Sequence, residues 1–194
     1  MSGWTGIRLQ GRRVALEPLG EEHEQGLWAA SRDQATWRWL SVRQPATRSE
    51  LRAFLGEALE AAASGAEIPF ATLLDGRVVG STRYLALAPE HRRLEIGWTW
   101  LHPAAWGSGA NVEAKLLQLG DAFGRLGCRR VELKTDALNE RSRRALAALP
   151  ASFEGIFRKH MLVRDGESRD SAWYAIVDDE WPQVRANLER RLGA

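Results

Sequence analysis

The sequence predicts a mixed α/β fold in which a central sheet carries helices on both faces, and three patterns predict it. Two apolar runs lie on either side of Asp75-Gly76, a dipeptide typical of β-hairpin turns. Residues 92–136 follow the order strand, glycine turn, helix, strand, which is a crossover between parallel strands. Residues 164–168, with the sequence RDGES, separate two further strand-like runs.

The other elements follow from apolar spacing. Alternating residues predict a first strand at 12–19, and spacings of three and four residues predict a helix at 49–63. We also expect a short helix at 22–30, a helix at 139–149, strands at 153–163 and 171–177, and a last helix with Trp181, Val184, Leu188 and Leu192. Because a proline ring holds φ negative, the helix at 139–149 should end without a left-handed residue at Pro150.

The crossover contains the most informative strand, at 92–101. Strict alternation places two sets of residues on opposite faces of this strand: Leu94, Ile96, Trp98 and Trp100 on one, and Glu95, Gly97, Thr99 and Leu101 on the other. The helix after the glycine turn keeps apolar spacing from Val112 to Leu126, and residues 129–136 alternate again as a strand.

Length and charge limit the classes of protein to consider. The 194 residues fit one domain, residues 1–194, in which residues 1–10 are expected to form an N-terminal tail. The net charge is +2 and the charges of both signs interleave, which argues against a nucleic-acid partner. The first ten residues lack signal-peptide features and no stretch approaches about 18 unbroken apolar residues. We therefore expect a cytoplasmic protein with no membrane partner.

Cysteine and histidine content argues against a metal site. Cys128 is the only cysteine, so the chain can form no internal disulfide and no cysteine-based zinc site. The four histidines are scattered without the spacing of metal ligands. We expect no bound metal.

The glycine turn at the start of the crossover helix is a candidate anion site. A helix start leaves backbone N–H groups unpaired and carries a positive partial charge, and Gly107 and Gly109 allow a large anion to approach. The turn matches neither a Walker loop nor a dinucleotide fingerprint, because Val112 stands where the latter has its third glycine. A serine- or asparagine-capped turn without a ligand is the alternative.

A cluster of arginines follows nearby, at Arg141, Arg143 and Arg144. Such a cluster either favours an anionic ligand or forms a solvated helix face. The sequence leaves both interpretations open.

Four motifs in order resemble the GCN5-related N-acetyltransferase (GNAT) family, in particular its RimJ/RimL-like branch. They are Glu95-Ile96-Gly97, the turn from Trp106 to Gly109, Glu113-Ala114, and Asn139 to Ser142. The likeness continues to Trp181. It implies a GNAT-type α/β (α+β) fold with a mixed, mostly antiparallel sheet of about seven strands, and acetyl-CoA as co-substrate without a metal.

The resemblance also implies how acetyl-CoA binds. The pyrophosphate would lie on backbone N–H groups of the turn, and the acetyl-pantetheine arm in a gap between the two crossover strands. The implied cofactor-binding residues are Trp106, Gly107, Ser108, Gly109, Ala110 and Asn111 at the turn, Trp100 and Leu101 along the arm, and Asn139 at a pantetheine amide. Trp106 replaces an arginine or glutamine common in relatives, so one charged contact is missing.

Two catalytic residues are candidates. Glu95 is the candidate base for the amine, directly or through a water, because Gly97 leaves space beside it. Relatives often protonate the leaving thiolate with a tyrosine at the position of Leu146, so the resemblance transfers that role to Ser142. The alternatives are a strand glutamate paired with an arginine, a helix-capping Asn139 and a first-turn polar Ser142.

The resemblance predicts an N-acetyltransferase that moves the acetyl group of acetyl-CoA directly to a primary amine, either a protein N-terminal amine or a small molecule. The alternative is a non-catalytic acyl-CoA-binding sensor on the same fold, for which the missing tyrosine and Trp106 would be consistent. Relatives often pair through sheet edges or C-terminal elements, so a homodimer is expected. The amine acceptor is not specified by the sequence.

Overall fold

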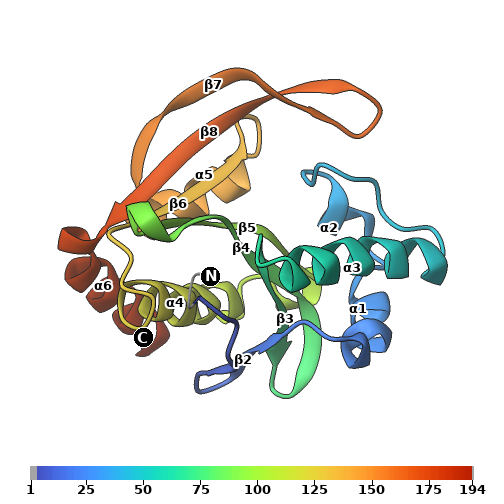
Figure 1. The fold of residues 1–194 in the computed structure, drawn as a ribbon, viewed down its shortest axis with the longest axis horizontal. Helices are drawn as coiled ribbons and strands as arrows, with labels where there is room; N and C mark the ends of the chain where they lie inside the picture. Colours follow the sequence, from blue (N-terminus) through green and yellow to red (C-terminus); the bar gives the residue numbers. More distant parts are fainter. Residues whose placement is uncertain (1–3, 194) are drawn as a thin grey trace.

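The computed structural model describes residues 4–193. These residues form one eight-stranded sheet in the order β1-β2-β3-β4-β5-β6-β8-β7, and only β5 and β6 run parallel (Figure 1). The strands are β1 (Leu9–Gln10), β2 (Val14–Pro18), β3 (Ile68–Leu74), β4 (Arg77–Ala88), β5 (Arg93–Leu101), β6 (Arg130–Asp136), β7 (Ser152–Val163) and β8 (Glu167–Val177). The predicted mixed, mostly antiparallel sheet is confirmed, with one strand more than expected.

The extra strand comes from the segment expected to be a tail. Leu9 and Gln10 pair with Leu16 and Ala15 of β2, and the Leu9 side chain is buried in the core. Of the predicted tail, residues 1–3 lie outside the described residues. Residues 9 and 10 are therefore part of the sheet, because an apolar side chain there covers the β2 edge.

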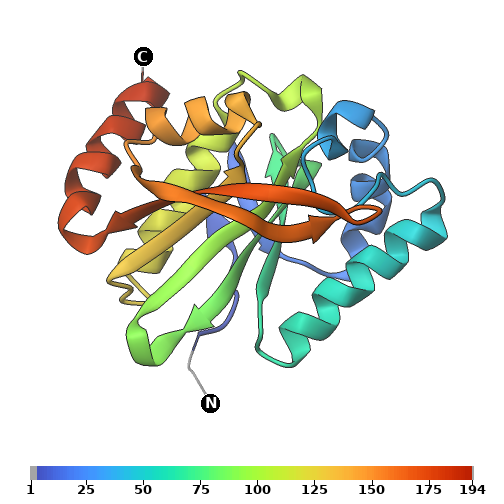
Figure 2. The same ribbon diagram turned by 90° about the horizontal axis from the view of Figure 1, so that it is seen from above.

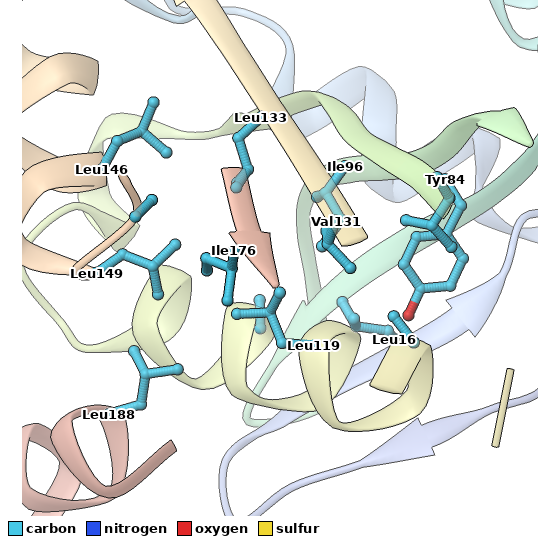
Figure 3. Close-up of a cluster of buried hydrophobic side chains, with 14 of the residues drawn as sticks. Leu16, Tyr84, Ile96, Leu119, Val131, Leu133, Leu146, Leu149, Ile176 and Leu188 are labelled. Carbon is cyan, nitrogen blue, oxygen red and sulfur yellow. The ribbon is translucent and has the colours of Figure 1, made fainter. Parts of the chain in front are cut away.

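Helices cover both faces of the sheet, as predicted. One apolar cluster joins the sheet to α1, α2 and α3, and a second joins the opposite face to α4, α5 and α6 (Figures 1 and 2). The helices are α1 (Glu24–Ala30), α2 (Gln34–Trp37), α3 (Arg48–Ala63), α4 (Ala110–Phe123), α5 (Glu140–Ala148) and α6 (Trp181–Gly193). In the second cluster, Leu119 of α4, Leu146 of α5 and Leu188 of α6 meet the strand residues Leu133 and Ile176 (Figure 3).

A bulge in β5 changes the predicted faces of this strand. Trp98 has a φ of 49°, and the pairing with β4 shifts so that Trp98 and Thr99 together lie opposite Thr82. Leu94, Ile96 and Leu101 then point into the cluster of α4 to α6, whereas Trp98 and Trp100 pack on α1 to α3. The predicted grouping of Trp98 and Trp100 with Leu94 and Ile96 is wrong, because a bulge reverses the alternation.

Two helix ends differ from the predictions. Helix α4 ends at Phe123, before the last apolar residue of the pattern, Leu126. Pro150 follows α5 with a φ of 23°, so the expectation of a negative φ there is wrong. The N–H of Ala151 bonds the carbonyl of Leu146 at 3.2 Å, which closes the type of helix-ending turn that needs positive φ at the intervening residue.

The crossover strands β5 and β6 pair only at their beginnings. The paired residues are Arg93 with Arg130, Leu94 with Val131, and Glu95 with Glu132. Beyond Glu95 the two strands separate, as the family resemblance implied. Among the residues that the structure describes, no backbone pairing joins β5 to β6 past this point. The sheet therefore opens in its middle.

The bulge gives a stability prediction at Gly80, which lies opposite Leu101. A Cβ at Gly80 would lie 1.9 Å from the carbonyl oxygen of Trp100, so Gly80→Ala should lower the free energy of unfolding by about 2 kcal/mol. Gly56→Ala in α3 is the control, because a Cβ there meets nothing within 4 Å and should stabilise the helix by about 0.5 to 1 kcal/mol. Urea unfolding of both variants measures the change in the free energy of unfolding. If both substitutions changed it equally, the close approach of Gly80 to the Trp100 carbonyl would be contradicted.

Candidate active site

The opening between β5 and β6 forms a cleft of about 400 Å³. A second hollow of about 520 Å³ adjoins it at the start of α4. The structure brings the predicted site residues together around these two spaces. Glu95, Trp100, Leu101, Trp106, Gly107, Asn111, Asn139 and Ser142 line the cleft, and Ser108, Gly109 and Ala110 line the second hollow.

The glycine turn presents free N–H groups to both spaces. Gly107 and Gly109 have φ of 75° and 86°, conformations that side chains disfavour. The Ser108 hydroxyl lies 3.3 Å from the Ala110 nitrogen and accepts its N–H. The N-cap of α4 is nevertheless Gly109, which makes no side-chain cap bond, so the serine- or asparagine-capped turn of the alternative interpretation does not form. Among the described residues, no acceptor meets the N–H groups of Gly107, Gly109 or Asn111. These groups remain available to an anion.

Trp106 and Arg141 form one side of the cleft at this turn. The Trp106 indole Nε1 donates to the Leu101 carbonyl at 2.9 Å, so this carbonyl already has a partner. The Arg141 guanidinium stacks 3.4 Å from the centre of the Trp106 ring. Arg141 thereby brings a positive charge to the turn where Trp106 replaces the charged residue of relatives. Of the arginine cluster, Arg143 and Arg144 instead bond Tyr174 and Glu140.

Glu95 lies buried at the point where β5 and β6 separate. Its side chain is 2% exposed, and its Oε2 lies 2.6 Å from the Nζ of Lys134 on β6. Burial raises the pKa of Glu95 above its ordinary value, and the positive charge of Lys134 opposes this shift. A Cβ at Gly97 would lie 2.9 Å from Glu95 Oε1, so the glycine does leave room for the carboxylate. The partner is a lysine and not the arginine of the alternative interpretation.

Asn139 and Ser142 sit at the start of α5. Asn139 Oδ1 accepts the Ser142 N–H at 3.1 Å, which is the capping role that the sequence left open. The Ser142 side chain is half-buried and lines the cleft, where its hydroxyl is available to a ligand. Leu146 lies one turn further along the helix and packs into the core, so it contributes no acid.

Lys115 of α4 is a cleft residue that the sequence analysis did not identify. Its ammonium lies 3.1 Å from Thr99 Oγ1 and 2.8 Å from Gln118 Oε1, and burial lowers its pKa to about 7. Its spacing from Val112 and Leu119 places a lysine on the apolar face of the helix, which is a signal that the sequence does carry.

The β7–β8 hairpin covers the far side of the cleft. Figures 1 and 2 show the hairpin crossing the molecule toward the segment after α2. At its tip, the Arg164 N–H bonds the Ser41 carbonyl at 2.8 Å, and the Arg164 guanidinium bonds the Leu40 carbonyl at 2.8 Å. The residues that line this part of the cleft come from both segments and from β5: Trp39, Leu40 and Ser41 follow α2, Met161 and Arg169 lie on the hairpin, and Trp98 lies on β5.

The parallel crossover thus opens into a cleft that has unpaired N–H groups at one end and a buried carboxylate at the other. The acetyltransferase (GNAT) domain family matches residues 13–150. The chain therefore belongs to the GNAT acetyltransferase family.

Similar proteins agree with this assignment. A GCN5-related N-acetyltransferase from Brucella melitensis is 33% identical and superimposes with a TM-score of 0.88 over 98% of this chain and 90% of that one. The uncharacterized N-acetyltransferase YoaA of Bacillus subtilis is 33% identical over 102 residues, which are 52% of this chain. The match covers 55% of YoaA, about half its length.

RimJ of Mycobacterium smegmatis, solved in complex with CoA-disulfide, shares the fold. It is 22% identical and superimposes with a TM-score of 0.78 over 95% of this chain and 94% of that one. At this identity the likeness concerns the fold alone.

Residues 4–193 contain neither a membrane-spanning helix nor a cluster of metal-ligating side chains. None of the helices in this range combines the length and apolar character needed to cross a bilayer. In the same range, His, Cys, Asp and Glu side chains form no group of three or more that could hold a metal ion.

Lys115 gives a prediction about pH. With a folded pKa of about 7 and an unfolded value near 10.5, the unfolded chain binds more protons than the folded protein between these values. The free energy of unfolding should therefore rise by about 2 kcal/mol from pH 7 to pH 9 in the wild type relative to Lys115→Met. Urea unfolding at both pH values measures the difference. If the free energy of unfolding changed with pH in the same way in both proteins, the lowered pKa of Lys115 would be contradicted.

Proposed function

We propose that this protein transfers the acetyl group of acetyl-CoA directly to a primary amine. The observation that carries the proposal is the line of free N–H groups at the start of α4, which opens into the cleft that holds buried Glu95. Glycine-flanked helix starts bind phosphate groups, and a cleft between separated strands accommodates an extended arm. The CoA-disulfide bound to RimJ on the same fold supports the same ligand.

The turn and its neighbours would bind the CoA end. The N–H groups from Gly107 to Asn111 would hold the pyrophosphate, with Arg141 as the nearby cation. The pantetheine arm would follow β5 toward Glu95, where the backbone of Trp100 lines its path. Because Asn139 Oδ1 already caps α5, only its amide NH₂ group is left for a pantetheine carbonyl.

The acetyl transfer would use two side chains of the cleft. Glu95 would take a proton from the acceptor ammonium, directly or through a water, and release the neutral amine. The amine nitrogen then forms a bond to the thioester carbon, and the carbon–sulfur bond breaks after the charge on the carbonyl oxygen collapses. Ser142 would hydrogen-bond the departing sulfur, which leaves as CoA thiol once the proton released from nitrogen reaches it.

Glu95 suits this role because its surroundings tune its proton affinity. Burial raises its pKa, which makes its carboxylate a stronger base, while the charge of Lys134 favours the ionised carboxylate. The same ion pair fixes the carboxylate beside Gly97, in the cleft that an acceptor amine would enter.

The alternative is a sensor that binds acyl-CoA without turnover. Leu146, buried where relatives often carry a tyrosine acid, favours this alternative. Buried Glu95 favours the enzyme, because a binding protein has no need of a costly buried carboxylate at the arm's end. Release of CoA thiol in the presence of an amine separates the two functions.

The expected homodimer stays a prediction. β7 is an edge of the sheet and carries the exposed apolar residues Phe153, Ile156, Phe157 and Leu162. Sedimentation equilibrium with and without Phe157→Asp tests whether copies pair through this edge.

The proposed CoA site predicts the effect of a charge at the turn. Gly109→Glu should abolish acetyl-CoA binding in calorimetric titration, because a carboxylate at the helix start repels the diphosphate. Gly56→Glu on α3 is the matched control, since its side chain meets nothing within 4 Å, and it should bind like the wild type. Unchanged binding by the folded Gly109→Glu protein would place the CoA site elsewhere.

The proposed base predicts both a rate and a pH effect. Glu95→Gln should lower kcat by about 100-fold or more without weakening acetyl-CoA binding. Because Lys134 lowers the pKa of Glu95, Lys134→Met should move the acidic limb of kcat/KM to higher pH. Lys159→Met, an exposed lysine on β7, is the control and should leave the profile unchanged. An unmoved limb in Lys134→Met would exclude Glu95 as the titrating base.

A further inference from the structure

Arg169 of β8 is the one buried arginine of the cleft wall whose guanidinium has no hydrogen-bond partner among the described residues. Its side chain is 8% exposed, and its Nε is sealed from solvent without an acceptor. Leaving guanidinium donors buried and unpaired is costly in free energy. The terminal nitrogens Nη1 and Nη2 also have no hydrogen-bond partner among the described residues, but they are not sealed from solvent, so they can donate to an acceptor from outside the chain.

The carboxylates around Arg169 do not supply that acceptor. Asp136 Oδ2 lies 4.0 Å from its Nε, which offsets charge but is beyond hydrogen-bond distance. Glu95 is bonded to Lys134 at 2.6 Å, and Glu167 is bonded to Arg164 at 2.6 Å. The carboxylates near Arg169 therefore offset its charge or are engaged elsewhere, but none of them accepts a hydrogen bond from its guanidinium.

The other polar groups near Arg169 do not supply an acceptor for its guanidinium. The pKa of His160 lies below its ordinary value because of burial and the nearby charges of Lys134 and Arg169. His160 Nδ1 lies 3.0 Å from Ser171 Oγ and shares a hydrogen bond with it, so His160 supplies no carboxylate-like acceptor either.

We propose that Arg169 binds an oxyanion of the amine acceptor. The acceptor would then be a small primary amine that carries a carboxylate or phosphate close to its amino group. Glu95 and Arg169 line the same cleft, and the charge of each shifts the pKa of the other. An ammonium bound at Glu95 and an oxyanion bound at Arg169 would therefore be carried by one short molecule. The guanidinium fork matches both oxyanions. A polyamine would instead bring positive charge against Arg169 and Lys134.

This inference rests on the proposed acetyl transfer, and matched acceptor pairs test it in the wild-type enzyme. One pair is an amino acid and its amide, and the other is an aminoalkyl phosphate and its amino alcohol. The anionic member should have a kcat/KM about 10- to 100-fold higher, the effect of one hydrogen bond to a charged group. Comparison of the two anionic members identifies carboxylate or phosphate. Equal rates within both pairs would overturn the proposal.

Variants of Arg169 test whether this residue makes the distinction. Arg169→Gln should remove the preference by raising KM for the anionic acceptor, with acetyl-CoA affinity unchanged, and Arg169→Lys should restore part of it. Arg158→Gln, an exposed arginine on the same hairpin, should keep the wild-type preference. Circular dichroism confirms that each variant folds. If Arg169→Gln does not fold, the acceptor pairs and Arg169→Lys still decide.

A binding measurement separates this proposal from the proposed function. Calorimetry on the CoA-saturated protein should show that anionic amines bind more tightly than their neutral partners, and that Arg169→Gln loses the difference. If this holds without any CoA release from acetyl-CoA, acetyl transfer is wrong while the anion subsite stands. If acetyl transfer occurs but neutral amines bind equally well, the anion subsite is wrong.

Discussion

The separation of β5 from β6 after Glu95 is the constraint on which the site depends. A parallel ladder that continued would bring the two strands within hydrogen-bonding distance and fill the cleft. The bulge at Trp98 and Thr99 lies in the half of β5 that pairs with β4 but no longer with β6. Gly80 accommodates the bulge, since only a glycine fits so close to the carbonyl of Trp100.

The chemistry of the cleft follows from burying charge in this opening. Glu95 and Lys134 form an ion pair in the cleft, and Lys115 and Arg169 also line it. Each of these charged groups has a lower free energy in water than in the cleft. Burial accordingly lowers the pKa of Lys115 to about 7. Burying these charged groups lowers the stability of the fold. The apolar core around Leu119 and Ile176 provides the stability that offsets this loss.

The local parts of the fold were predictable from the sequence, and the long-range parts were not. The hairpin at Asp75-Gly76 and the crossover around Gly107 and Gly109 depend on neighbouring residues, so their patterns identify them. The family resemblance identified Glu95 and the residues of the glycine turn as site residues. In the folded structure they lie around the cleft and the hollow beside it. The bulge depends on register with β4, and Arg169 reaches the cleft from a distant strand. Nothing local in the sequence distinguishes Arg169 from an exposed strand arginine.

Amide hydrogen exchange with and without CoA tests most directly whether the opened crossover is the CoA site. The account predicts that CoA slows exchange at Gly107, Gly109 and Asn111, whose N–H groups lack partners, and along β5 near Trp100, while α3 stays unchanged. Slowed exchange confined to other elements, or no change at the turn under saturating CoA, would contradict the account.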